Sequence, residues 1–159
     1  MNMKINIEIN NLSEEEIDSR LAKIAAALVI ENETKETDYL GAEASIAFVG
    51  EREMIQVNKK YRGKDEATDV LSFAYGDNAA GFTVSGGIRM LGELVVCSKR
   101  VRKDAKDRGK SFEEEMIWAV IHGILHLLGY NHEKGGEESK TMRGKEKDYL
   151  DKLKIEKSK

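Results

Sequence analysis

The three histidines of this chain lie within eleven residues of one another and carry the clearest chemical signal in the sequence. The segment reads His122-Gly-Ile-Leu-His126-Leu-Leu-Gly-Tyr-Asn-His132. Residues four apart on a helix share one face, about 6 Å apart along the axis, so His122 and His126 can direct ring nitrogens at one ion. Gly129 can end the helix in a left-handed conformation and turn His132 back toward the other two rings. The spacing therefore predicts a three-histidine metal site.

The number of ligands predicts a catalytic metal site. Three protein ligands leave one tetrahedral position for water or substrate, whereas structural zinc sites usually have four protein ligands. Neither the single cysteine nor a fourth histidine lies near the cluster to close it. We expect one zinc ion per chain, although three imidazoles also suit other divalent transition metals. Burying three imidazoles without a common partner would cost roughly 1–3 kcal/mol each, which argues against a purely structural reason for the cluster.

The histidine spacing is that of the metzincin peptidases, His-x-x-x-His-x-x-Gly-x-x-His, with one difference. Those peptidases carry their general base, a glutamate, directly after the first histidine. This chain has Gly123 at that position. The pattern keeps the ligands of a metzincin-like metal helix and lacks the peptidase base. It favours a different hydrolase, with a metallopeptidase-like hydrolase as the alternative.

Two further segments carry a recognisable pattern. Residues 58–73 read NKKYRGKDEATDVLSF, and residues 91–96 read LGELVV. Together with the histidine segment, and in this order, they resemble the signature of the YbeY family of bacterial endoribonucleases. Two positions differ from the family pattern: Asn131 stands where an aspartate usually precedes the third histidine, and Ala67 stands where a proline is usual. The first difference removes a carboxylate from the neighbourhood of the expected metal, and the second affects loop rigidity.

The resemblance implies both a fold and a function. The fold is a mixed α/β domain with a metal cleft. The function is a metal-dependent endoribonuclease that acts on single-stranded RNA near the 3′ end of small-subunit ribosomal RNA, in ribosome biogenesis. A non-enzymatic, ribosome-associated RNA-binding protein with a structural metal remains an alternative. Because the net charge is −3, RNA contacts must come from local basic patches.

The resemblance also places the family's functionally important arginine at Arg62. A guanidinium presents a rigid fork of donors to phosphate oxygens and stays charged at any relevant pH. We therefore expect Arg62 and the metal ligand His122 to be catalytic. The metal would lower the pKa of a bound water toward about 7, while Arg62 offsets the charge on the phosphate oxygens. Whether metal hydroxide or the ribose 2′-OH attacks is left open.

Other polar residues are weaker candidates. Besides Arg62, the basic residues expected to contact RNA are Lys59, Lys64, Arg102 and Lys106. The last two belong to a basic run that equally fits a solvated helix face. Asp69 and Glu93, beside predicted strands, can orient a metal ligand or cap a turn. Glu115 lies seven residues before His122, on the same helical face, and is a third candidate for orienting it.

Hydrophobic periodicity predicts one α/β (α+β) domain over residues 1–159, with a small mixed sheet of about four strands and about five helices. We expect strands at 3–9, 44–49, 69–75 and 91–96, and a loop at 76–87. We expect helices at 13–30, 51–61, 98–109, 111–128 and from about 137 onward. Two of them should begin with capping boxes, Ser13 with Glu16 and Ser111 with Glu114.

Composition narrows the setting. The single cysteine, Cys97, excludes an intramolecular disulfide; we expect a buried thiol and no disulfide-linked partner. No signal-peptide pattern is found at the N-terminus, and the longest apolar stretch, 116–128, is too short to span a membrane. These features favour a cytoplasmic protein that does not associate with a membrane.

Overall fold

The sheet is mixed and has the strand order β1-β2-β5-β3, with β4 also paired to β5. The structure, a computed structural model, describes residues 4–34, 40–75, 82–84, 87–130 and 136–157. The strands are β1 (Lys4–Asn11), β2 (Gly41–Val49), β3 (Val70–Ala74), β4 (Phe82–Val84) and β5 (Ile88–Cys97). The pairs β1–β2 and β2–β5 are parallel, whereas β3 and β4 run antiparallel to β5. Strand β3 therefore forms one edge of the sheet, away from β1.

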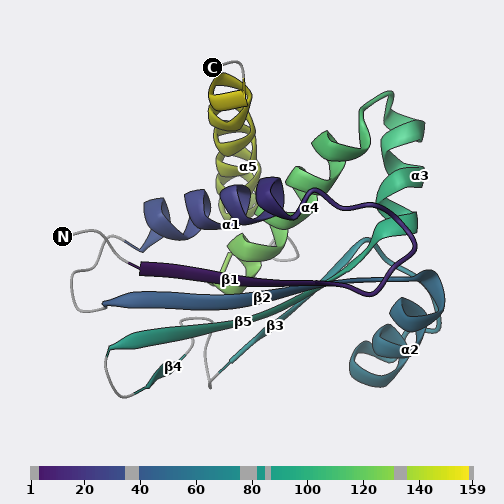
Figure 1. The fold of residues 1–159 in the computed structure, drawn as a ribbon, viewed down its shortest axis with the longest axis horizontal. Coiled ribbons are helices and arrows are strands. Elements are labelled where there is room, and N and C mark those ends of the chain that lie inside the picture. The colour runs from purple at the N-terminus through teal and green to yellow at the C-terminus, as the bar shows by residue number, and fades with distance from the viewer. Residues whose placement is uncertain (1–3, 35–39, 76–81, 85–86, 131–135, 158–159) are drawn as a thin grey trace.

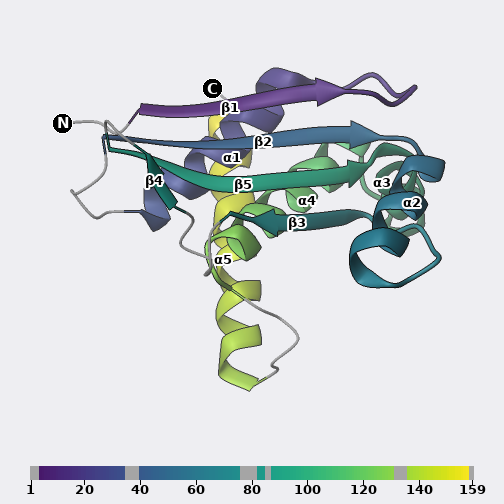
Figure 2. The same cartoon turned by 90° about the horizontal axis from the view of Figure 1, so that it is seen from below.

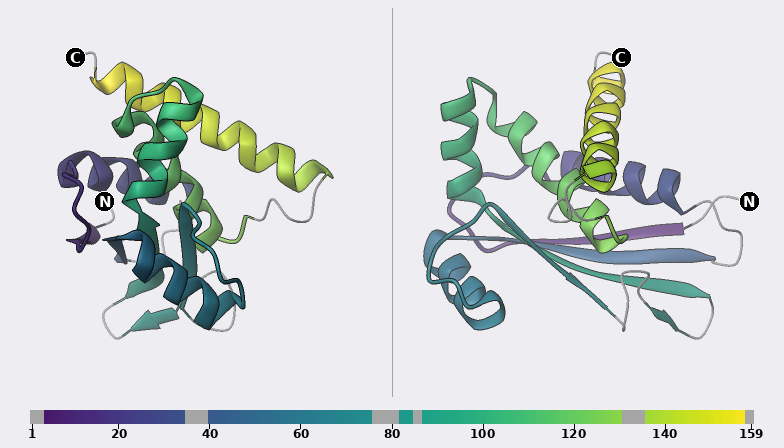
Figure 3. Two further views of the ribbon diagram at one scale, coloured as in Figure 1. Left: turned by 90° about the vertical axis from the view of Figure 1, so that its right-hand side faces the viewer. Right: turned by 180° about the vertical axis from the view of Figure 1, so that it is seen from behind.

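Four helices lie over one face of the sheet, and α2 packs against the other (Figures 1 and 3). The helices are α1 (Ser19–Glu33), α2 (Glu51–Arg62), α3 (Ser98–Arg108), α4 (Phe112–Leu127) and α5 (Gly136–Lys157). Figure 2, which views the sheet from below, shows α5 running across the strands and projecting past the β3 edge. No helix within the described residues is long and apolar enough to cross a membrane.

The alternation of side-chain directions along β5 explains why helices pack on both faces of the sheet. Leu94 and Val96 belong to the main core beneath α1 and α4, whereas Val95 and Cys97 belong to a second apolar cluster with Met54 of α2. Successive side chains of a strand point to opposite faces, so one apolar run supplies two layers. The predicted burial of Cys97 is confirmed, since its side chain is fully buried.

The predicted fold class is confirmed, with two corrections in detail. Helix α1 begins at Ser19, with Asp18 as its cap, so the predicted capping box of Ser13 and Glu16 is wrong. The hydroxyl of Ser13 instead donates to Asn11 at 2.7 Å and accepts from Ser98 at 2.9 Å. The second predicted box, Ser111 with Glu114, is confirmed at the start of α4.

The second correction concerns the segment 76–87, predicted as a loop. Strand β4 lies inside it, because β5 begins at Ile88, three residues earlier than predicted, and the additional residues of β5 pair with β4. A three-residue strand has too little periodicity to be recognised from sequence.

Helix α4 lies unusually close to the sheet at Gly123. A Cβ atom built there would lie 2.8 Å from both terminal methyls of Leu94 and 3.2 Å from a methyl of Val70. The hydroxyl of Ser72 donates to the Gly123 carbonyl at 3.1 Å, which fixes the helix against the edge strand. A larger residue at this position would force Leu94 to shift, so packing favours glycine there.

This close approach can be tested with two alanine substitutions. Both Gly123→Ala and Gly144→Ala should gain the same helix propensity, but a Cβ atom at Gly144 meets nothing within 4 Å. Because overpacking a core costs about 1–3 kcal/mol, Gly123→Ala should be less stable than Gly144→Ala by about that amount. Urea unfolding at pH 7 measures the difference, and equal stability of the two variants would contradict the packing argument.

Candidate active site

A cleft of about 810 Å³ opens along the β3 edge of the sheet, between α2 and the C-terminal half of α4. Its lining includes several of the residues singled out in the sequence: Arg62, Lys64, Asp69, His122 and His126. The cleft thus brings two of the predicted metal ligands together with the predicted phosphate-binding arginine. The arginine lies 60 or more positions before the two histidines in the sequence.

The two helical histidines face each other across one turn of α4. Their Nε2 atoms lie 3.1 Å apart. Two nitrogens bound at 2.0–2.1 Å to one tetrahedral ion would lie about 3.3–3.4 Å apart, so this pair fits a shared metal with almost no movement. The predicted third ligand, His132, lies outside the described residues. Within the described residues, no group of three histidines, cysteines or carboxylates gathers around one point.

Glu146 of α5 holds the ring of His122 from behind. Its Oε2 lies 2.6 Å from Nδ1 of His122, and its side chain is only 7% exposed. Trp118, one turn earlier on α4, stacks on the same ring with centroids 4.7 Å apart and an interplanar angle of 22°. A carboxylate that accepts from Nδ1–H fixes the tautomer, so the Nε2 lone pair is directed into the cleft. This is the usual partner of a metal-binding histidine.

No sequence pattern marks Glu146 as a functional residue. It lies 24 residues after His122, on a different helix, so no local spacing connects the two. Its proximity to His122 depends on how α5 packs against α4, which the sequence pattern alone does not define.

Arg62 ends α2 and reaches over the edge strand. Its guanidinium donates to the Ser72 carbonyl at 2.9 Å and lies 4.8 Å from the ring centroid of Phe73. These contacts hold the guanidinium at the cleft, where the donors not used by Ser72 can reach a ligand. Lys64 lines the same cleft, whereas Lys59 is exposed and does not line it.

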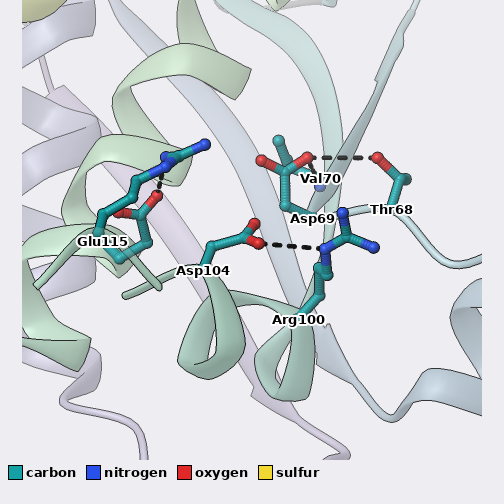
Figure 4. A network of polar contacts seen from close by, with 7 residues as sticks. Thr68, Asp69, Val70, Arg100, Asp104 and Glu115 are labelled. Carbon is teal, nitrogen blue, oxygen red and sulfur yellow. Dashed lines mark hydrogen bonds and ion pairs between the residues drawn. The ribbon is translucent and has the colours of Figure 1, made fainter. Parts of the chain in front are cut away.

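Asp69 and Glu93, the two carboxylates beside predicted strands that could orient a metal ligand, have different positions in the structure. Asp69 lines the cleft, but its Oδ1 accepts from the Val70 amide at 2.8 Å and from the Thr68 hydroxyl at 3.3 Å, as Figure 4 shows. These contacts match the turn-capping alternative. Glu93 pairs with Phe73 across the β3–β5 ladder and does not line the cleft.

Glu115 is buried beside Arg108 rather than beside the histidines. Its Oε1 accepts from the Arg108 guanidinium, and its Oε2 is buried without a hydrogen bond to any described residue. Burial raises the pKa of the Glu115 carboxyl, and the charge of Arg108 only partly offsets this effect. Among the described residues Glu146, not Glu115, is the carboxylate that contacts His122.

The basic helix α3 does not line the cleft. Arg102 pairs with Glu15 at 2.7 Å and lies 4.6 Å from the ring centroid of Phe112. Lys106 is exposed on the same helix. Contact of either residue with RNA stays a prediction.

Comparison with known proteins identifies the family. The family model described as "Endoribonuclease YbeY" matches residues 6–154. The chain belongs to the YbeY family. An "Endoribonuclease YbeY" of Aquifex aeolicus is 43% identical over 111 residues, 70% of each chain. One of Thermodesulfovibrio yellowstonii is 36% identical over 96% of this chain and 99% of its own. The resemblance inferred from the three sequence motifs is confirmed.

The fold is also found in a solved relative. The solution structure of TM1509 from Thermotoga maritima superposes with a TM-score of 0.62 at 31% identity, covering 93% of this chain and 90% of that one. The arrangement described here for a YbeY-family chain therefore has an experimental counterpart.

A cluster around Glu33 anchors the helix that carries Glu146. The Glu33 carboxylate accepts from Tyr130 at 2.7 Å, from Lys145 at 3.1 Å and from Tyr149. It thereby joins the end of α1, the segment after α4, and α5. Burial opposes ionisation of Glu33, but the hydrogen bonds from the two tyrosines and the lysine outweigh it and lower the pKa of its carboxyl.

Glu33→Gln should lower the free energy of unfolding at pH 7 by about 1–3 kcal/mol, because the amide cannot accept three hydrogen bonds as the carboxylate does. Since the folded-state pKa of Glu33 is lowered from 4.5, its stabilising effect is present above pH 4.5 and lost as the pH falls through the folded-state value. The difference between wild type and variant should therefore shrink below pH 4.5.

Glu31→Gln provides the control, since Glu31 is exposed on the same helix. Urea titrations of the three proteins at several pH values measure the effect. A Glu33→Gln deficit that persists unchanged at acid pH would show that ionisation of Glu33 has no part in it.

Proposed function

We propose that this YbeY-family chain is a metal-dependent endoribonuclease whose ion is bound by His122, His126 and His132. The observation that carries the proposal is the 3.1 Å approach of the His122 and His126 Nε2 atoms, with Glu146 behind the first ring. The sequence spacing supplies His132 as the third ligand. We expect zinc, because three imidazole ligands with one open position are typical of catalytic zinc sites.

Each neighbouring side chain then has a definite task. When bound, such an ion supplies Lewis acidity toward a phosphoryl oxygen and a water. Glu146 accepts a hydrogen bond from Nδ1–H of His122 and would keep its Nε2 available as a metal ligand. Arg62, held by the Ser72 carbonyl, presents the donors that remain on its guanidinium to the phosphate and offsets the charge that develops there.

The relatives named "Endoribonuclease YbeY" support RNA as the substrate. A single strand suits a cleft that opens along a sheet edge, where the backbone can pass Lys64 and Arg62 on its way to the histidines. Following the motif resemblance, we propose that the RNA lies near the 3′ end of small-subunit ribosomal RNA. The protein would then act in the cytoplasm on the small ribosomal subunit or its precursor.

The packing of Gly123 opposes the peptidase alternative. The peptidase glutamate would stand at this position, where even a Cβ atom would lie 2.8 Å from Leu94. A glutamate directly after His122 would therefore force Leu94 to shift, which disfavours a peptidase-type base at this position.

A cleavage assay tests the function. The metal-loaded protein should cut single-stranded RNA, lose this activity with a chelator, and leave casein intact. Arg62→Lys should reduce cleavage by roughly 10²–10³-fold while metal content stays normal, because an ammonium keeps the charge but not the fork. Near wild-type cleavage by a folded, metal-loaded Arg62→Lys protein would exclude the phosphate-binding role. Casein cleavage without RNA cleavage would exclude the endoribonuclease.

Metal affinity tests the proposed cage independently of activity. Glu146→Gln should weaken zinc binding about 10–100-fold, because the amide holds the His122 ring less well. His122→Ala should abolish tight zinc binding. Glu137→Gln, which changes an exposed residue of the helix that carries Glu146, should leave zinc binding unchanged. Competition with a chromophoric zinc chelator gives the dissociation constants. Equal affinities for wild type, Glu146→Gln and His122→Ala would place the ion elsewhere.

A further inference from the structure

Tyr61, in the last turn of α2, is unusually exposed for an aromatic residue. The residue is 55% exposed, and Leu12 and Leu40 are the other large hydrophobic residues with high exposure among the described residues. Within the described part of the chain its hydroxyl makes no hydrogen bond, so no polar contact of the ring's tip explains its position. Unlike Leu12, it lies next to a residue of the cleft, Arg62.

The ring of Tyr61 is held in place by the edge strand. It packs against Phe73 of β3 in an edge-to-face arrangement, with centroids 5.3 Å apart and an interplanar angle of 68°. The same Phe73 ring carries the Arg62 guanidinium at 4.8 Å, and that guanidinium is also bound to the Ser72 carbonyl. Tyr61, Phe73 and Arg62 thus form one preorganised aromatic and cationic group at the rim of the cleft.

A cationic residue stands directly before and directly after Tyr61 in the sequence. The Lys60 ammonium lies 5.1 Å from the Tyr61 ring centroid, and Arg62 follows directly. Proteins that bind single-stranded nucleic acids combine cations along the backbone with aromatic rings on which bases stack. An RNA strand can use all three groups, because its phosphates can contact the two cations and a base can stack on the ring.

We infer that Tyr61 is a stacking platform for an unpaired nucleobase of the RNA, one or a few nucleotides from the phosphate held by Arg62. The inference rests on the proposed endoribonuclease function and adds a subsite to it. Because every base has a π face, the platform binds any base and imposes single-strandedness rather than sequence. A base inside a duplex is already stacked on both faces and cannot use the platform.

RNA binding with single abasic positions tests the platform. Kd is measured by fluorescence anisotropy for an intact oligonucleotide and for a series in which one nucleotide at a time lacks its base. For wild type, one abasic position near the cleavage site should weaken binding about 5- to 100-fold. Tyr61→Ala should weaken binding of the intact RNA by a similar factor and be insensitive to that position. Tyr61→Phe should behave as wild type.

Leu12→Ala is the matched control, since it also truncates an exposed hydrophobic side chain, 71% exposed and outside the cleft lining. It should leave every Kd unchanged. Tyr61→Ala with wild-type affinity, or with an equal loss for all abasic RNAs, would overturn the platform while wild-type cleavage still supported the function. A wild-type protein that neither binds nor cuts RNA would overturn the proposed function itself.

Discussion

Helix α4 lies so close to the sheet at Gly123 that an added Cβ atom would lie 2.8 Å from the terminal methyls of Leu94. This contact sets the position of the neighbouring His122 and, one turn later, of His126 relative to the edge strand β3. Ser72 of that strand links both walls of the cleft: its hydroxyl donates to the Gly123 carbonyl, and its carbonyl accepts from Arg62. One residue of the edge strand therefore fixes the distance between the histidine pair and the arginine, which lie on helices at opposite faces of the sheet.

The position of Glu146 behind the His122 ring depends on contacts between distant segments. Glu146 reaches His122 only because α5 crosses the end of α4 (Figure 2), and α5 is held there by Lys145 and Tyr149, which bind Glu33 of α1. Burial disfavours the ionised form of Glu33, and the hydrogen bonds from its three donors more than offset this effect. The orientation of a ring in the cleft thus rests on a polar cluster of which only Tyr130 itself lines the cleft.

The part of the site that could be predicted from sequence is the part encoded by local spacing. The four-residue interval of His122 and His126 and the capping box of Ser111 both depend on helix geometry alone, and the structure has both as predicted. Glu146 is determined by packing between helices, and no periodicity reveals it. The Ser13 box failed for the same reason, because a tertiary contact with Ser98 competes with the local cap.

The replacement of the peptidase glutamate by Gly123 also makes electrostatic sense for an anionic substrate. A phosphodiester already carries a negative charge, so a carboxylate added near the first histidine would repel it. In this chain the carboxylate nearest the ring, Glu146, stands behind His122 and is engaged by its Nδ1. Arg62 and Lys64 line the cleft on the opposite side, together with the carboxylates Glu66 and Asp69. Imidazole rings in front of a buried carboxylate, opposed by a fixed guanidinium, form a site that suits a phosphate.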